Sequence, residues 1–161
     1  MGRRHTLTVP LVAIAFGSNL GDRHGSILDA ASEVAAFLSN FRLSSIIETA
    51  PVAPGLEHDP PYLNAVGVGE SDLPPRELLR RLQAIERARG RTRSFAGAPR
   101  TVDLDLILAG DARVHDADLT VPHPRFRERR FVLEPLVELA PDLTDPATGR
   151  TMRDLLARLT R

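Results

Sequence analysis

The chain has 161 residues, of which 42% are apolar and 26% charged, a composition typical of a globular protein with one compact domain. Its 21 basic and 21 acidic residues cancel, which argues against a surface built for nucleic acid or anionic lipid. The absence of cysteine excludes disulfides, thiolate nucleophiles and cysteine metal sites, and is compatible with a reducing cytoplasm. All 21 basic residues are arginine, so a Walker P-loop, a protein-kinase site and Schiff-base catalysis, which need lysine, are excluded.

Apolar patterns divide the chain into strands and helices. Strands are expected where apolar or alternating runs end at turn residues, over residues 9–16, 43–49, 62–70 and 101–108. Helices are expected where apolar residues recur every three or four positions, over residues 22–39, from a cap at Ser71 or Asp72 to about Arg89, and after Thr151, which begins a capping box. The order β-α-β-β-α-β suits a ferredoxin-like α+β fold better than a doubly wound α/β fold, because the second and third strands are joined without a helix.

The chain shows no internal repeat and no linker. We expect residues 1–8 to form a flexible N-terminal tail and residues 9–161 to form a single domain. No run approaches the ~20 apolar residues of a membrane helix. We therefore expect a cytoplasmic protein with no membrane partner and no nucleic-acid partner.

The segment 99–107 carries the sharpest chemical signal. Side chains alternate along a strand, so Asp103 and Asp105 share one face while Leu104 points to the other. The two aspartate Cα atoms then lie about 6–7 Å apart, and both carboxylates can converge on one hard cation. A bare D-x-D is also compatible with a solvent-facing strand edge, but the adjacent Arg100 favours Mg²⁺ with a polyphosphate, because Mg²⁺ is usually held by one or two carboxylates and by phosphate oxygens.

Arginine is concentrated in two segments. Twelve of the 21 arginines lie within residues 76–100 and 125–130, and guanidinium groups match phosphate oxygens bidentately. Those on the outer face of a predicted helix are expected only to solvate it: Arg76, Arg80, Arg81 and Arg87. Those in loops or beside the D-x-D motif are expected to bind an anion: Arg91, Arg93, Arg100 and Arg129.

Five further polar or aromatic residues are candidates for ligand contacts, and each also has a purely structural interpretation. Gln83 and Glu86 neighbour each other on a helix, and Glu86 lies at the edge of the apolar stripe, where an ion pair is as good an explanation as a ligand. Tyr62 and Asn64 share a strand face and could stack on and hydrogen-bond a flat heterocycle, although a core tyrosine is the default interpretation. His123 lies between two prolines, in a rigid loop where a histidine is often structural.

In this order the motifs resemble the 6-hydroxymethyl-7,8-dihydropterin pyrophosphokinase family. The resemblance extends from about residue 13 to residue 143. It is carried by residues 15–22 (AFGSNLGD), 48–51 (ETAP), 62–66 (YLNAV), 83–86 (QAIE), 90–93 (GRTR), 98–105 (APRTVDLD), 119–123 (LTVPH) and 129–131 (RRF). So many blocks in one order are more specific than any single motif.

The resemblance implies a ferredoxin-like, three-layer α/β/α domain that transfers the diphosphate of ATP to the pterin hydroxymethyl group and leaves AMP. It implies that Asp103 and Asp105 hold two Mg²⁺ ions and that Arg91 and Arg100 stabilise the moving diphosphate. The positions implied to contact ATP are Gln83, Glu86, Arg93, Leu106, Thr120, His123 and Arg129. The positions implied to contact the pterin are Ala50, Val52, Tyr62, Asn64 and Phe131.

The chain departs from the family where many members have a basic residue and a tryptophan, because Ala96 and Gly97 stand there. We expect a monomer whose partners are ATP and 6-hydroxymethyl-7,8-dihydropterin. Two alternatives are a non-catalytic ferredoxin-like module that binds nucleotide or metal, and a kinase that transfers only the γ-phosphoryl group and forms ADP.

Overall fold

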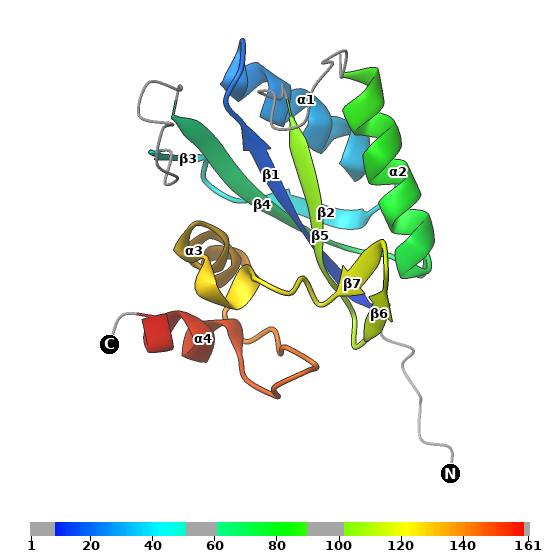
Figure 1. The fold of residues 1–161 in the computed structure, drawn as a ribbon, viewed down its shortest axis with the longest axis vertical. Coiled ribbons are helices and arrows are strands. Elements are labelled where there is room, and N and C mark those ends of the chain that lie inside the picture. The colour runs from blue at the N-terminus through cyan, green and yellow to red at the C-terminus, as the bar shows by residue number, and fades with distance from the viewer. Residues whose placement is uncertain (1–8, 51–60, 90–101, 160–161) are drawn as a thin grey trace.

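A five-stranded antiparallel sheet forms the centre of the computed structural model, which describes residues 9–50, 61–89 and 102–159 (Figure 1). Its strands are β1 (Leu11–Ser18), β2 (Ser39–Leu43), β3 (Ile47–Thr49), β4 (Tyr62–Glu70) and β5 (Asp103–Ala109). β4 pairs with β2 and β3 on one side and with β1 on the other, and β1 pairs with β5. The order β2-β4-β1-β5, with every pair antiparallel, confirms the ferredoxin-like α+β prediction.

Helices cover both faces of the sheet. They are α1 (Arg23–Ala35) and α2 (Pro75–Ala88) on one face, and α3 (Arg130–Leu139) and α4 (Met152–Leu159) on the other (Figure 1). Between β5 and α3 lie a small hairpin of β6 (Val114–Asp116) and β7 (Leu119–Val121) and the short 3₁₀ helix η1 (Phe126–Glu128). The result is the predicted three-layer α/β/α arrangement.

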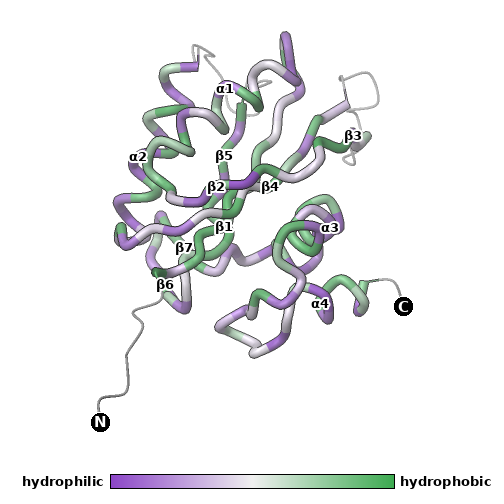
Figure 2. The backbone as a smooth tube through the Cα atoms, turned by 180° about the vertical axis from the view of Figure 1, so that it is seen from behind, coloured by the Kyte–Doolittle hydropathy of each residue, from purple (hydrophilic) through white to green (hydrophobic). Residues whose placement is uncertain are grey.

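The two faces of the sheet have separate apolar cores. On β1, Val12, Ile14 and Phe16 pack towards α1 and α2, whereas Ala13 packs towards α3 and α4. Because both faces are covered, β1 reads as a nearly continuous apolar run, and Figure 2 shows apolar residues along the central strands.

A β-bulge in β5 shapes the region beside the D-x-D motif. The register between β1 and β5 shifts at Ala13 and Ile14, so that Ile107 is an extra residue on β5. The carbonyl oxygen of Ile107 accepts a hydrogen bond from the backbone N–H of His123 at 2.9 Å. The bulge therefore ties the loop that carries His123 to β5, two residues beyond Asp105.

The single strand predicted over residues 43–49 is wrong, because the chain forms β2 and β3 with a break between them. At the break, the Ser44 hydroxyl accepts a hydrogen bond from the backbone N–H of Val66 at 2.9 Å and so replaces a backbone group in the ladder. The next residue, Ser45, donates its backbone N–H and its hydroxyl to Glu138 of α3. Side-chain hydrogen bonds thus draw these residues out of the strand.

The predicted cap of α2 at Ser71 or Asp72 is also wrong. The Ser71 hydroxyl accepts a hydrogen bond from the backbone N–H of Leu73 and closes a turn before the helix. Pro74 is the N-cap and makes no side-chain cap, and Pro75 is the first helical residue. Proline suits this position, because the first turn of a helix has no intrahelical partner for its N–H groups.

Two other helices begin at the residues that the sequence indicated, α1 after Asp22 and α4 after Thr151. The Asp22 carboxylate caps α1 by accepting from the backbone N–H of Gly25 at 3.0 Å, although α1 ends at Ala35 rather than at residue 39. The Thr151 hydroxyl caps α4 by accepting from the backbone N–H of Asp154 at 3.1 Å. Both caps satisfy N–H groups that have no partner within the helix.

The helix α3 was not predicted. Its buried residues, among them Val132, Leu133 and Leu136, have helical spacing, but Pro135 lies inside the helix. Proline removes one intrahelical hydrogen bond and usually ends a helix, so packing against the sheet has overridden the local preference. Within the described parts of the chain, no helix has both the length and the apolar character needed to cross a membrane.

Candidate active site

The two aspartates of the D-x-D motif lie on the α3 side of β5. Leu104 and Leu106 pack in the core beneath α1 and α2, so alternation turns Asp103 and Asp105 to the opposite face, as predicted. Asp103 is half-buried and Asp105 is exposed. In the residues that the structure describes, no cluster of three or more carboxylates or imidazoles could hold a metal by itself. Two carboxylates on one face fit Mg²⁺ that is also bound by phosphate oxygens.

A glycine separates these aspartates from the candidate pterin residues. Gly17 of β1 pairs with Asn64 of β4 on one side and with Asp103 of β5 on the other. A Cβ atom on Gly17 would lie 3.5 Å from Asn64 Oδ1 and 3.8 Å from the Tyr62 ring. The Asn64 amide and the Tyr62 ring therefore lie within van der Waals range of Gly17, and neighbouring strands about 4.8 Å apart put Asn64 and Asp103 roughly 10 Å from each other.

Two polar side chains at the end of β1 are buried without a hydrogen bond. Ser18 is fully buried and Asn19 is 3% exposed, and neither the Ser18 hydroxyl nor Asn19 Oδ1 has a partner within the described residues. Buried polar groups are nearly always hydrogen-bonded in folded proteins. Ser18 Oγ and Asn19 Oδ1 are therefore two unsatisfied polar atoms at the end of β1 that borders the candidate site.

Tyr62 and Asn64 also face the α3 side of the sheet, because Val66, farther along the same face of β4, packs in that core. Asn64 is 7% exposed, and its Nδ2 donates a hydrogen bond to Thr49 Oγ1 at 2.7 Å. This contact fixes the amide with Oδ1 towards Gly17. Ala50 follows β3 directly and is exposed.

Arg129 and Phe131 stand at the start of α3, which packs against β4. Phe131 is half-buried in the first turn, and the guanidinium carbon of Arg129 lies 5.7 Å from the centre of its ring. The pair is within the range of a cation–π interaction. Phe131 and Tyr62 therefore belong to the same side of the sheet.

A cavity of about 280 Å³ opens beside the free edge of β5. It lies between β5, α2 and the β6–β7 hairpin, and its lining consists of Leu79, Leu104, Asp105, Leu106, Ala117, Asp118, Leu119, Thr120, His123 and Pro124. Four of the predicted residues thus meet in one cavity: Asp105, Leu106, Thr120 and His123. The lining is mixed, because four of its ten residues, Asp105, Asp118, Thr120 and His123, are polar or charged and the others are apolar.

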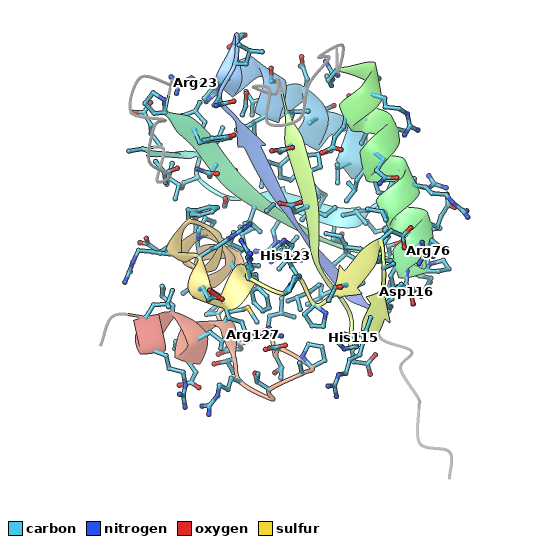
Figure 3. The ribbon with its side chains drawn as sticks, viewed as in Figure 1. Arg23, Arg76, His115, Asp116, His123 and Arg127 are labelled. Atoms are coloured by element: carbon cyan, nitrogen blue, oxygen red, sulfur yellow. The ribbon has the colours of Figure 1, made fainter. Side chains whose placement is uncertain are left out.

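His123 is held as a neutral imidazole. Its Nδ1 accepts a hydrogen bond from the backbone N–H of Arg125 at 3.1 Å, which leaves the ring proton on Nε2. Burial lowers the pKa of His123; the Asp105 carboxylate opposes this effect, and the charges of Arg129 and Arg125 lower the pKa further. Figure 3 shows His123 between β5 and the start of α3. Its Nε2–H can donate a hydrogen bond to a phosphate oxygen.

Glu86 supports the edge strand. It is 7% exposed on α2, and its Oε2 accepts a hydrogen bond from the backbone N–H of Leu104 at 2.8 Å. By alternation, the backbone of Leu106 also faces the free edge of β5 and so borders the cavity. Gln83 is exposed on α2, one turn before Glu86.

Arg76 does more than solvate α2, contrary to the prediction. Its guanidinium bonds to Asp116 at 2.6 Å and to Asp118 at 3.0 Å, and so joins α2 to the β6–β7 hairpin. Arg80 and Arg81 pair with Glu77 along the helix surface. Several predicted residues lie outside the described part of the chain: Val52, Arg91, Arg93 and Arg100.

Comparison with known proteins assigns the family. A family model described as 7,8-dihydro-6-hydroxymethylpterin-pyrophosphokinase (HPPK) matches residues 13–141. The chain belongs to this family. Two relatives named 2-amino-4-hydroxy-6-hydroxymethyldihydropteridine pyrophosphokinase are those of Bacillus subtilis, 41% identical over 84% of this chain and 81% of the relative, and of Pseudomonas aeruginosa, 40% identical over 91% and 90%.

Longer proteins also contain the HPPK domain. The folic acid synthesis protein fol1 of Pneumocystis carinii is 35% identical over 92% of this chain, which spans only 20% of the length of fol1. The crystal structure of wild-type Plasmodium falciparum HPPK-DHPS superimposes with a TM-score of 0.72 at 13% identity, over 94% of this chain and 45% of that chain. That structural likeness supports the fold alone.

Part of the candidate site has no signal in the sequence. Leu79 and Asp118 line the cavity but come from a helix and a hairpin that are far apart in sequence, so no motif joins them. Gly17 could have been found from the sequence, because a glycine inside an apolar strand indicates the close approach of a ligand or of another backbone.

Proposed function

We propose that this pyrophosphokinase transfers the diphosphate of ATP to 6-hydroxymethyl-7,8-dihydropterin across the face of β5 that carries Asp103 and Asp105. The observation that carries the proposal is the row Asn64–Gly17–Asp103, which sets candidate pterin residues and candidate metal ligands on one face of the sheet. The cavity at the edge of β5 adjoins this face through Asp105.

ATP would occupy the cavity with its triphosphate towards Asp105 and His123. The leucines of the lining suit an adenine ring, because they offer apolar contact to its faces. Asp103 and Asp105 would hold Mg²⁺, which when bound neutralises charge on the phosphate oxygens. His123 Nε2–H and the Arg129 guanidinium would bind phosphate oxygens, and we assign Arg91, Arg93 and Arg100 to the same task from their sequence positions.

The pterin would lie beside Gly17, on the face of the sheet that carries Asn64 and Asp103. Tyr62 and Phe131 would contact its faces, since both belong to the α3 side of the sheet. Asn64 would hydrogen-bond its edge through Oδ1, and the backbone near Ala50 and Val52 would complete that edge. Burial of a flat ring between aromatic side chains gives both apolar contact and orientation.

The reaction needs no covalent residue. The pterin hydroxymethyl oxygen forms a bond to the β-phosphorus of ATP as the bond from that phosphorus to the α,β-bridging oxygen breaks, and AMP leaves. Transfer of this kind depends on positioning and on neutralisation of charge. A site composed of carboxylates, arginines and a neutral histidine suits those requirements.

The deciding experiment incubates the protein with ATP, Mg²⁺ and 6-hydroxymethyl-7,8-dihydropterin and identifies both products. We expect AMP and the pterin diphosphate in equal amounts. ADP with a pterin monophosphate would indicate γ-phosphoryl transfer instead. Nucleotide binding without any turnover would indicate a non-catalytic binding module, and either result would contradict the proposal.

A further inference from the structure

The cavity beside β5 has one charged residue that the proposed transfer does not use. Asp118 lies at the turn of the β6–β7 hairpin and lines the cavity together with the leucines and with Asp105. Its side chain is 69% exposed, so the carboxylate stands at the rim rather than at the bottom.

The Asp118 carboxylate is fixed and charged. Arg76 NH1 donates to both of its oxygens, at 3.2 Å and 3.0 Å, while Arg76 NH2 donates to Asp116. Figure 3 shows Arg76 of α2 beside Asp116 of the hairpin. Hydrogen bonds from Arg76, followed by its positive charge, lower the pKa of Asp118, so the group is an anion at neutral pH.

The carboxylate still has capacity to bind a ligand. An ionised carboxylate accepts about four hydrogen bonds, and a single guanidinium nitrogen uses only part of that capacity. As an acceptor without a proton, Asp118 recognises a hydrogen-bond donor or a cation, and among the parts of a nucleotide only the hydrogen-bond donors qualify. The positive charge of Arg76 also offsets the repulsion between this carboxylate and a nearby polyphosphate.

The position of Asp118 at the rim of the cavity determines which hydrogen-bond donors of a bound nucleotide it can reach. The base would lie among Leu79, Leu104 and Leu106, and the phosphates would reach Asp105 and His123. The ribose joins these two parts and leaves its two neighbouring hydroxyls at the solvent side. An acidic side chain that accepts hydrogen bonds from ribose hydroxyls is an established solution in other nucleotide sites.

We propose that Asp118, held by Arg76, binds the ribose 2′- and 3′-hydroxyls of ATP and makes this pyrophosphokinase selective for ribonucleotides. The inference rests on the proposed function, because it takes ATP as the occupant of the cavity. Arg76 acts here as a positioning residue for Asp118.

The test measures equilibrium binding of ATP, 2′-deoxy-ATP and 3′-deoxy-ATP with Mg²⁺ and without pterin, so that no transfer occurs. We expect each deoxynucleotide to bind about five- to tenfold more weakly than ATP, the usual effect of losing one hydrogen bond, because the Asp118 carboxylate is largely exposed to water. In Asp118→Ala the preference should fall below about twofold for the same reason. The readout is the ratio of affinities, because loss of a negative charge can itself strengthen binding of every nucleotide.

Asp116→Ala is the matched control. It also removes a carboxylate partner of Arg76 from the same hairpin, but Asp116 is not among the cavity-lining residues, so the preference for ATP should remain. Equal affinity of the wild type for all three nucleotides, or equal loss of preference in the two variants, would overturn the assignment of Asp118. ATP binding with the expected preference but without AMP formation in the complete assay would contradict the proposed function alone. Failure to bind any nucleotide would overturn both.

Discussion

At the scale of single residues, the D-x-D motif gives the most direct test of the site. Asp103→Ala or Asp105→Ala should lower turnover by about three decades, roughly 4 kcal/mol of transition-state stabilisation, because each variant loses a proposed metal ligand. The fold should survive, since neither carboxylate belongs to an apolar core. Turnover measured at saturating Mg²⁺ checks the prediction, with the exposed turn residue Asp111→Ala as control. Near-normal turnover in both variants would refute the metal assignment.

Phe131 tests the pterin side in the same way. Phe131→Ala should weaken pterin binding by about 1–3 kcal/mol through loss of stacking and apolar contact. The affinity for ATP should change much less. Calorimetric titration with each ligand checks this, and Phe37→Ala, which packs with the core on the other side of the sheet, is the control for lost packing. A similar loss for both ligands would assign Phe131 to general packing.

At the scale of elements, the sequence predicts the faces of strands whose alternation of side chains is visible within the strand itself. The alternation in β4 and β5 is enough to place Tyr62 with Asn64 and Asp103 with Asp105. The break between β2 and β3 could not be predicted, because it depends on a hydrogen bond that the Ser44 hydroxyl accepts from β4 and on one that the next residue donates to α3. The cavity is missed for the same reason, since its walls meet only in the folded protein.

The contact between α2 and β5 leads to a prediction about an element. Glu86→Ala should lower the free energy of unfolding by about 1–3 kcal/mol, because the buried N–H of Leu104 loses its acceptor. Gln83→Ala, at an exposed position of the same helix, should change it by less than about 0.5 kcal/mol. Chemical denaturation of both variants gives the comparison. If Glu86→Ala is as stable as Gln83→Ala, Glu86 does not support β5, and a role in ligand binding alone would remain.

At the scale of the whole molecule, the C-terminal segment holds the loop that carries candidate phosphate-binding residues. Asp145, between α3 and α4, is fully buried and accepts from Arg127 Nε at 2.6 Å and from Arg127 NH2 at 3.0 Å. Arg127 belongs to η1, between His123 and Arg129 (Figure 3). Neither partner has a local signal in the sequence, because the pair joins residues 18 positions apart across an unpredicted helix.

This ion pair makes stability depend on pH. Burial raises the pKa of the Asp145 carboxyl, but hydrogen bonds from Arg127, Thr148 and the backbone of Ala147 outweigh it, so the pKa lies below its ordinary value. The unfolded chain, with an aspartate pKa of about 3.9, therefore takes up the proton first as pH falls. The stabilisation is fully present above about pH 5 and is lost as pH falls through the native pKa.

Asp145→Asn should accordingly cost about 3 kcal/mol at pH 7, because it leaves Arg127 without its charged partner, and less at pH 3. Urea denaturation at both pH values measures the difference from wild type. Asp142→Asn is the control, since that carboxylate is 80% exposed and its ion pair with Arg153 should contribute less than about 1 kcal/mol. If the difference in unfolding free energy between Asp145→Asn and wild type stays constant from pH 7 to pH 3, the carboxylate charge does not stabilise the contact between Asp145 and Arg127. If that difference becomes smaller on acidification, ionised Asp145 stabilises the packing of the C-terminal segment against the loop between His123 and Arg129.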